Sequence, residues 1–371
     1  MNFAAAPAAA VHVATIGDST IDNLIWMDKD ARGLFKVGDS VVGRLRAALG
    51  GGGAAAGVVT NFAADGFTSS NVLHGALPML SSAAWRKVGE PFPCAVGEAL
   101  LPLQALADLH RNTKPVTHVL LSVGGNDVRE ILQNMHALPQ VVARFHENYA
   151  RICERVLALD GVKLVLMLQY QVCLSHEHGG YGVYSAMDSL PGPGTGAEKL
   201  QAVMERIYGP VIKLAQTHRL AVIDLPRTFD PADAELYRLQ IEPSAKGSGL
   251  IAAVVAHALA THDFAGESVL YSRANGAFRA EANRFDGPTN PWRIMRSLSG
   301  AAGGGGAALA PPAQMAAQLD AAASHAAALP HAVAGLTEMG FPEDKVRAAL
   351  ARCGNLPQQA LELLLAPDHG L

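Results

Sequence analysis

Three short polar segments contain the residue types that nucleophilic catalysis requires. Ser19 ends the segment Gly17-Asp18-Ser19, Gly66 follows Asp65, and Asn126 lies within 124–127. A serine hydroxyl attacks a carbonyl group efficiently only when a base accepts its proton, and the oxyanion that forms needs preorganised donors. The backbone N–H groups of Ser19 and Gly66 and the side-chain amide of Asn126 could converge on one such oxygen. Glycine suits the second position, because a backbone without a side chain lets a substrate oxygen come close.

Each of these segments directly follows an apolar, β-branched run that predicts a buried strand. The runs are 11–16, 58–62 and 117–123, and two further runs at 162–168 and 220–224 have the same character. Helical stretches at 41–49, 96–110, 138–159 and 197–219 lie between or after them. This alternation predicts a five-stranded parallel sheet with helices on both faces, whose carboxyl edge would collect the three segments.

Composition narrows the functional classes. The chain has 371 residues, half of them apolar, and a net charge of −4. No long basic run suggests nucleic acid or an anionic membrane as a partner, and no stretch has the roughly 18 consecutive apolar residues of a membrane helix. The N-terminus has no charged secretory region, and the cysteines lack metal-ligand spacing, so we expect reduced thiols, no metal or other cofactor, and a cytoplasmic location. The cysteines are Cys94, Cys153, Cys173 and Cys353.

The three polar segments, taken together, resemble the blocks of the SGNH superfamily of GDSL-type esterases and lipases. The matching residues are Gly17-Asp18-Ser19, Gly66 and Gly124-Gly125-Asn126-Asp127, and the resemblance covers 11–262. It implies a flavodoxin-like three-layer α/β/α sandwich, a small ester substrate and a nucleophilic Ser19. It also implies an oxyanion hole made of Ser19, Gly66 and Asn126.

At the position of the last block, this sequence departs from the usual pattern of the superfamily. The family has Asp-x-x-His followed by proline, the histidine being the general base and the aspartate its orienter. Here Leu239 stands where the aspartate belongs, Glu242 stands where the histidine belongs, and Pro243 follows. The usual triad is therefore absent.

Three hypotheses remain for the missing base. Glu242 could itself accept the proton if burial raises its pKa from the ordinary value near 4.3. His176 or His178 could reach the site from the loop 176–196, which follows the fourth strand. In the third hypothesis the site binds a ligand without chemistry. Arg238 and Lys246 are expected to be solvated surface charges, although beside Glu242 they could lower its pKa and so oppose its function as a base.

Four further segments surround this domain. Residues 1–10 are predicted to be disordered, and 299–330 is an Ala/Gly-rich flexible linker. Between the domain and the linker, 263–298 combines arginines with aromatic residues, and Glu281 and Asp286 dilute its positive charge. We expect it to be an extension or strap packed on the hydrolase-like domain.

The C-terminal segment 331–366 has apolar positions at the spacing of three short helices. Its Met339-Gly340-Phe341 loop and its Leu-rich end resemble a ubiquitin-associated (UBA) domain, a small three-helix bundle. The resemblance implies ubiquitin or ubiquitinated proteins as partners, contacted by Met339, Gly340, Phe341 and Leu364. The whole chain is therefore interpreted as a serine ester hydrolase coupled to a ubiquitin-binding module, or alternatively as a catalytically weak or inactive ligand-binding adaptor that the same module recruits to ubiquitin.

Overall fold

The computed structural model describes residues 11–50, 57–112, 115–174, 187–188, 190, 192–284, 333, 337 and 342–352. The chain forms two compact units, one of 1–175 with 186–303 and one of 176–185 with 304–371. Within the described ranges, none of the helices combines the length and the apolar character needed to cross a membrane.

The first unit is built on a seven-stranded sheet with the order β2-β1-β3-β4-β5-β8-β9. All neighbouring pairs are parallel except β8 and β9. The strands are β1 (His12–Gly17), β2 (Val58–Asn61), β3 (His118–Ser122), β4 (Lys163–Met167), β5 (Ala221–Ile223), β8 (Val269–Ala274) and β9 (Ala277–Ala282). The first five strands coincide with the predicted ones to within two residues at each end.

The predicted five-stranded sheet is two strands short. Residues 269–282, expected within an extension or strap, form a β-hairpin whose first strand pairs with β5. Asn275 (φ 51°) and Gly276 (φ 80°) make its two-residue turn, and a positive φ at both positions suits the twist of a hairpin. β9 was not predicted because four of its six residues are exposed, and its sequence therefore lacks the alternation of apolar and polar residues that indicates a half-buried strand.

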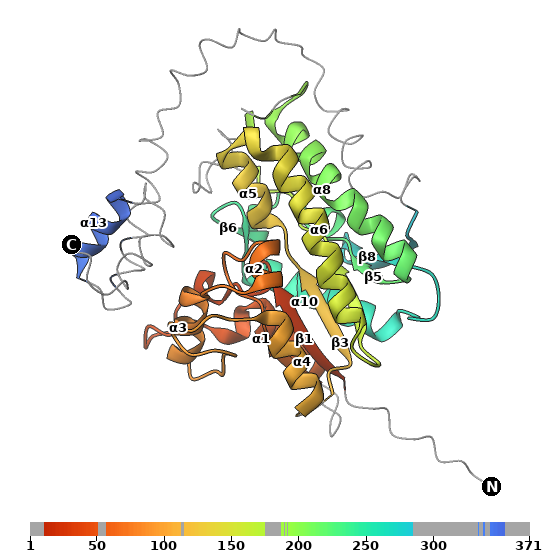
Figure 1. Cartoon of the computed structure of the whole chain (residues 1–371), viewed down its shortest axis with the longest axis horizontal. Helices are drawn as coiled ribbons and strands as arrows, with labels where there is room; N and C mark the ends of the chain where they lie inside the picture. Colours follow the sequence, from red (N-terminus) through yellow and green to blue (C-terminus); the bar gives the residue numbers. More distant parts are fainter. Residues whose placement is uncertain are drawn as a thin grey trace. The chain divides into compact units, whose positions relative to one another are not determined.

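Helices cover the sheet on both faces (Figure 1). On one face α1 (Val41–Gly50) packs against α10 (Ala245–Thr261). On the other, α6 (Leu138–Leu157) packs against α2 (Ser69–His74) and α8 (Gly196–His218). The same unit contains α3 (Met79–Lys87), α4 (Pro102–Asn112), α5 (Gly125–Gln133) and the short α9 (Leu225–Thr228). This arrangement confirms the three-layer α/β/α sandwich.

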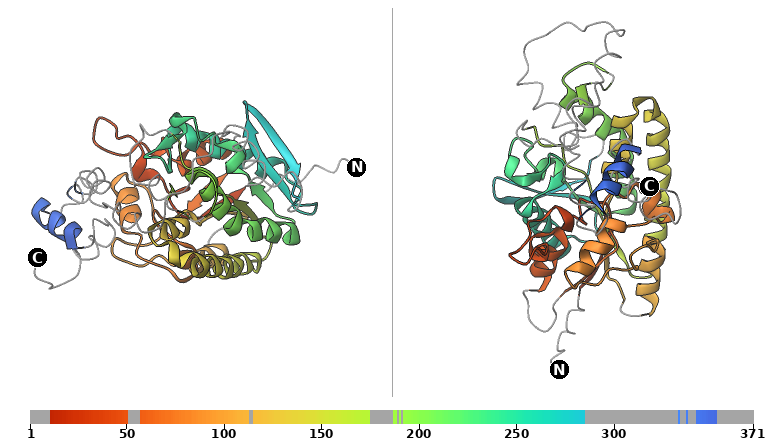
Figure 2. Two further views of the ribbon diagram at one scale, coloured as in Figure 1. Left: turned by 90° about the horizontal axis from the view of Figure 1, so that it is seen from above. Right: turned by 90° about the vertical axis from the view of Figure 1, so that its left-hand side faces the viewer.

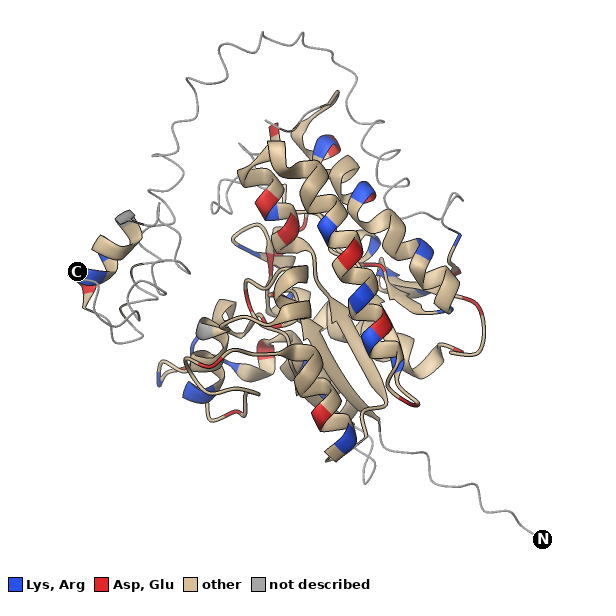
Figure 3. Ribbon diagram, in the orientation of Figure 1, with Lys and Arg blue, Asp and Glu red and all other residues tan. Residues whose placement is uncertain are grey.

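The core lies between the layers. Every residue of β1 and β3 is buried, as expected for parallel strands with helices on both sides. The outer faces of the helices instead carry lysine, arginine and acidic residues in alternation, which Figure 3 shows most clearly along α6. The helix predicted at 96–110 begins only at Pro102, because Leu100 pairs with Ala76 in an isolated bridge and Gly97 has a φ of 85°.

In the second unit the structure describes one helix of appreciable length, α13 (Glu343–Arg352). It follows Pro342 as predicted, and Val346, Ala349 and Leu350 are buried. The other predicted features of this unit lie outside the described residues, among them the contact residues Met339, Gly340, Phe341 and Leu364. The same holds for the alternative bases His176 and His178, for Cys353, and for the predicted disordered 1–10 and linker 299–330.

Candidate active site

Ser19 lies at the carboxyl end of β1, where the chain must turn sharply past β3. A Cβ atom on Gly17, whose φ is 151°, would lie 1.7 Å from the backbone oxygen of Ser122, so only glycine fits. The next residue, Asp18, donates its N–H to that same oxygen at 3.0 Å. This turn leaves Ser19 half-buried at the edge of the sheet.

Asp18 holds three loops together at this edge. Its carboxylate accepts hydrogen bonds from the N–H of Thr20 (3.1 Å), the N–H of Gly125 (3.3 Å) and Nε2 of Gln169 (3.2 Å). A turn follows Ser19, and the next helical residues are 24–26. Burial raises the pKa of Asp18 to about 6.

The structure brings Glu242 to Ser19, 223 positions away in the chain. The hydroxyl of Ser19 donates to Oε1 of Glu242 at 3.2 Å. Glu242 is only 4% exposed, and its other oxygen, Oε2, is buried without a hydrogen-bond partner among the described residues. The residue that replaces the family histidine in the sequence therefore also lies beside the serine in space.

Glu242 belongs to a tight hairpin that is held by its surroundings. It begins β7 (Glu242–Pro243), which pairs with β6 (Tyr237–Arg238). Between these strands Leu239 (φ 47°) and Gln240 (φ 76°) adopt the left-handed conformation, which is strained for residues other than glycine.

Contacts from distant segments fix this hairpin. The Tyr170 hydroxyl donates to the backbone oxygen of Ile241 at 2.7 Å, and the N–H of Cys173 donates to that of Gln240 at 2.8 Å. On the other side Asn23 donates from Nδ2 to the backbone oxygen of Pro243 at 3.1 Å. These hydrogen bonds stabilise the strained loop. They thereby hold Glu242 in position to accept the hydrogen bond from Ser19.

The surroundings of Glu242 favour its protonated form. Burial raises its pKa well above the usual range, and the negative charge of Asp65 raises it further, whereas the bond from Ser19 and the charge of Arg129 lower it. Asp65 itself has a pKa raised to about 7, chiefly by burial and by the charge of Asp22. The site therefore holds a carboxyl group that ionises far above the pH at which a free glutamate does.

The arginine and lysine expected beside Glu242 have other partners. Arg238 pairs with Asp28, while Lys246 pairs with Asp233 at 3.0 Å and with Glu235 at 2.6 Å. Both side chains are exposed, in agreement with their interpretation as solvated surface charges, and the pKa of Glu242 is raised rather than lowered.

Two of the three predicted oxyanion donors, Gly66 and Asn126, lie on segments that contact each other. Gly66 has a φ of 79° in the loop after β2, and Asn126 lies in the first turn of α5, after β3. Nδ2 of Asn126 donates to the backbone oxygen of Phe67 at 3.1 Å. An amide nitrogen carries two hydrogens, so one remains for a further acceptor.

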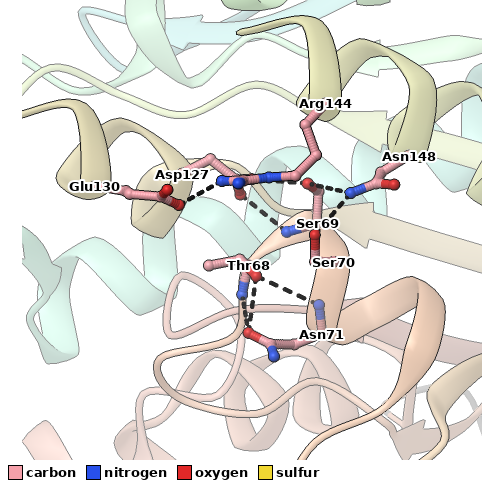
Figure 4. Close-up of polar contacts among 8 residues, drawn as sticks. All are labelled: Thr68, Ser69, Ser70, Asn71, Asp127, Glu130, Arg144 and Asn148. Atoms are coloured by element: carbon pink, nitrogen blue, oxygen red, sulfur yellow. Dashed lines mark hydrogen bonds and ion pairs between the residues drawn. The ribbon is translucent and has the colours of Figure 1, made fainter. Parts of the chain in front are cut away.

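A polar network anchors the Gly66 loop to α5 and α6 (Figure 4). The Asp127 carboxylate accepts from the N–H of Ser69 at 2.9 Å and from its hydroxyl at 2.7 Å. From α6, Asn148 donates to the hydroxyl oxygens of Ser69 (3.3 Å) and Ser70 (2.9 Å). Thr68 caps α2 reciprocally with Asn71. Asp127 therefore connects α5 with the first turn of α2.

We expect Asp127→Asn to lower the free energy of unfolding by about 1–3 kcal/mol, because an amide can accept only one of the two bonds from Ser69 and buries its own NH₂ group. Urea denaturation measures this change. Glu130→Gln is the matched control, since Glu130 on the same helix forms a half-exposed pair with Arg144 and should contribute less than about 1 kcal/mol. Equal losses in both variants would contradict the anchoring function of Asp127.

Gln169 and Asp65 were missed in the sequence analysis. Gln169 is the second residue after β4, and its Oε1 accepts from the Thr20 hydroxyl at 2.7 Å. A polar residue after a strand was the signal used for Ser19 and Asn126, so the same rule applied to the fourth strand would have found Gln169. Nothing in the sequence singles out Asp65, whose effect on Glu242 depends on the folded chain.

The remaining histidines of the last helical region serve packing. His262 is buried and contacts the Tyr271 hydroxyl through Nδ1 at 3.1 Å, and His257 stacks on Phe278 with ring centroids 4.3 Å apart. Across the described part of the chain, no cluster of three or more His, Cys, Asp or Glu side chains could hold a metal ion. Cys94, Cys153 and Cys173 are free thiols, as predicted.

Comparison with known families characterises the C-terminal segment. Residues 330–367 match the family model of the UBA-like domain. This match confirms the resemblance inferred from 331–366, and the described helix α13 belongs to the UBA-like domain. No curated protein matches the chain significantly.

Solved structures similar to the chain cover about two thirds of it. One is described as a GDSL-like lipase from Parabacteroides merdae (15% identity, 68% of this chain and 97% of that one, TM-score 0.42). Others are a carbohydrate acetylesterase from Sinorhizobium meliloti (14%, 67% and 98%, 0.38) and an extracellular lipase from Streptomyces rimosus (13%, 68% and 100%, 0.38). Their names belong to the class that the motifs resemble, but with sequences this different the chemistry must be argued from the residues of this chain.

Proposed function

We propose that the first unit is a serine ester hydrolase in which Ser19 is the nucleophile and Glu242 is the general base. The observation that carries the proposal is the hydrogen bond from the Ser19 hydroxyl to Oε1 of Glu242. A nucleophile and a base within hydrogen-bond reach of each other are the minimal unit of this chemistry. The test is covalent labelling by a fluorophosphonate probe, expected for the wild-type chain and absent from Ser19→Ala.

In the acylation step, Oγ of Ser19 attacks the carbonyl carbon of the ester while its proton moves to the ionised Glu242. The negative charge that develops on the carbonyl oxygen is stabilised by the N–H groups of Ser19 and Gly66 and by the amide of Asn126. When the tetrahedral intermediate collapses, the C–O bond to the alcohol breaks and Glu242 returns the proton to the leaving oxygen. The product is an acyl group on Ser19.

Water completes the cycle by the same groups. It attacks the acyl carbon, gives one proton to Glu242, and releases the carboxylic acid as the proton returns to Oγ of Ser19. Only the ionised carboxylate can begin either step, and burial disfavours that form. We therefore expect the rate to rise with pH over a range well above that of an ordinary glutamate.

The second candidate function is an inactive SGNH-type adaptor that binds a ligand at this site. One observation favours it, namely that burial raises the pKa of Glu242, which lowers the fraction of the carboxylate that can accept the serine proton at a given pH. The probe separates the two functions, because an adaptor without an activated serine stays unlabelled at every pH.

We further propose that the UBA-like domain recruits ubiquitin or ubiquitinated proteins, which would place the protein's action in the cytoplasm. The family match at 330–367 supports this proposal. The contact residues carried over from the family are Met339, Gly340, Phe341 and Leu364, and a large aromatic residue such as Phe341 is typical of an interface anchor.

Titration of isotopically labelled ubiquitin with the full chain should give shifts that fit a dissociation constant of about 10⁻⁴ M, as expected for a small, transient apolar interface. The double change Met339→Ala and Phe341→Ala should remove the shifts. Lys345→Ala is the control, because Lys345 is exposed on α13 and outside the carried-over contact set. A folded wild-type chain that gives no shifts at millimolar concentration would exclude ubiquitin as the partner.

A further inference from the structure

The edge strand β9 presents an exposed backbone edge. Among the strands of the described residues β9 is the last in the sheet, and Ala277, Phe278, Arg279 and Ala280 are all exposed, Phe278 to 41%. Figure 2 shows the β8–β9 hairpin, in cyan, at the end of the sheet. Proteins usually shorten, charge or cover such edges, because the free N–H and C=O groups are a template for another strand.

The alternation of hydrogen-bonded and non-bonded pairs along the hairpin shows which backbone groups of β9 face outward. Ala274 and Ala277 flank a two-residue turn, where a hydrogen-bonded pair is expected, and Asn283 donates to the backbone oxygen of Ser268 at 2.8 Å. Bonded and non-bonded pairs alternate along an antiparallel ladder. Residues 277, 279 and 281 therefore bond to β8, while Phe278, Ala280 and Ala282 direct their N–H and C=O groups away from it.

The outward backbone groups of one β9 strand can pair with the same groups of a second β9 strand. In an antiparallel pairing of two β9 strands centred on Ala280, Ala280 faces its own copy and Phe278 faces Ala282 of the second copy. All these positions have outward backbone groups, so the pairs can exchange hydrogen bonds. The large ring of Phe278 meets the smallest side chain with a Cβ atom, which avoids a clash.

The charges select the same register. Centred on Ala280, the pairing places Arg279 opposite Glu281 of the second copy, twice by symmetry, in the closely spaced non-bonded positions. A shift by two residues in one direction sets Arg279 opposite Arg279, and in the other direction Glu281 opposite Glu281. Like charges opposite each other are unfavourable, so of these three registers the centred one satisfies both the backbone and the charges.

We propose that β9 pairs antiparallel with β9 of a second copy of this chain, giving a two-fold dimer in which the two sheets are continuous. Arg227 contacts Glu281 at 2.8 Å and holds its carboxylate in place on the face that Arg279 of the second copy approaches. Arg279 itself is exposed on β9, so its guanidinium is accessible to the Glu281 carboxylate of a second copy.

Sedimentation velocity of the full chain, from about 1 to 100 µM, tests the dimer. Ala280→Pro should yield a monomer, because proline removes an outward N–H that β8 does not use and is tolerated on edge strands. Arg279→Glu should weaken the dimer about tenfold or more, since it creates two like-charge pairs. Lys213→Glu, which makes the same charge change on the exposed face of α8, should leave it unaltered.

Mixing two variants tests the register itself. Arg279→Glu and Glu281→Arg should each fail to self-associate, yet together they should form a heterodimer with one native pair and one reversed pair. Thermal unfolding of each variant shows whether the hairpin stays folded. A wild-type chain that is monomeric at 100 µM overturns the proposal, and so does a dimer that persists in both Ala280→Pro and Arg279→Glu.

Discussion

The Ser19→Ala variant is expected to lose all fluorophosphonate labelling and to hydrolyse esters slower by on the order of a thousandfold or more, because no other group replaces the attacking oxygen. The half-buried position of Ser19 at the end of β1 and its bond to Glu242 make it the activated hydroxyl of this site. Intact-mass spectrometry after exposure to the probe measures the labelling, and release of a chromogenic alcohol from a short acyl ester measures the rate.

Ser272→Ala is the matched control for this experiment. Ser272 lies in β8, away from the three loops of the site, and its replacement should leave labelling and rate unchanged. If Ser19→Ala is labelled as strongly as the wild-type chain, the nucleophile lies elsewhere. If the wild-type chain is not labelled at any pH, the adaptor function stands instead.

The parallel part of the fold was predictable from the sequence because its strands are buried on both faces. Continuous apolar runs such as 117–123 can only be strands of this kind when polar turns and helices separate them. The β8–β9 hairpin escaped prediction for the opposite reason. β9 is an edge strand whose side chains face solvent, so its sequence carries arginine, glutamate and alanine without a hydrophobic pattern.

The site was predictable to the extent that its residues follow strands. Ser19, Gly66 and Asn126 could be found at strand ends, and Glu242 by its place in the last block. The contact between Ser19 and Glu242 depends on the strained turn at Leu239 and Gln240, which no sequence pattern announces, since glycine is the residue expected there. The effect of the Asp65 charge on the pKa of Glu242 likewise depends on the folded chain.

Glu242→Gln should reduce hydrolysis to the level of Ser19→Ala, because a glutamine keeps the shape of the side chain but cannot accept the proton. In the wild-type chain the rate should follow the ionised fraction of Glu242. Since burial and the charge of Asp65 raise its pKa, activity should be low where an ordinary glutamate is already ionised and should rise at higher pH. A pH profile of kcat/KM measures this rise, the rising limb of the profile.

The stability of the fold should change with pH in the opposite direction. Below the unfolded pKa of glutamate both states bind the proton, and Glu242 adds no pH dependence. Between that value and the raised folded pKa the folded state binds more protons, so the free energy of unfolding falls as pH rises. Glu242→Gln removes the contribution of Glu242 to the pH dependence of the free energy of unfolding. Urea denaturation at several pH values detects the change even without a known substrate.

Two variants distinguish Glu242 from the other candidate bases. Asp65→Asn removes the negative charge next to Glu242, so the rising limb of the pH profile should move to lower pH while Ser19 remains reactive. The double change His176→Ala and His178→Ala should leave both the limb and most of the rate intact. If the histidine variant instead loses activity and Glu242→Gln retains it, the base comes from the loop after β4. If Asp65→Asn leaves the pH dependence unchanged, the titrating group is not Glu242, because the charge of Asp65 contributes to the raised pKa of Glu242.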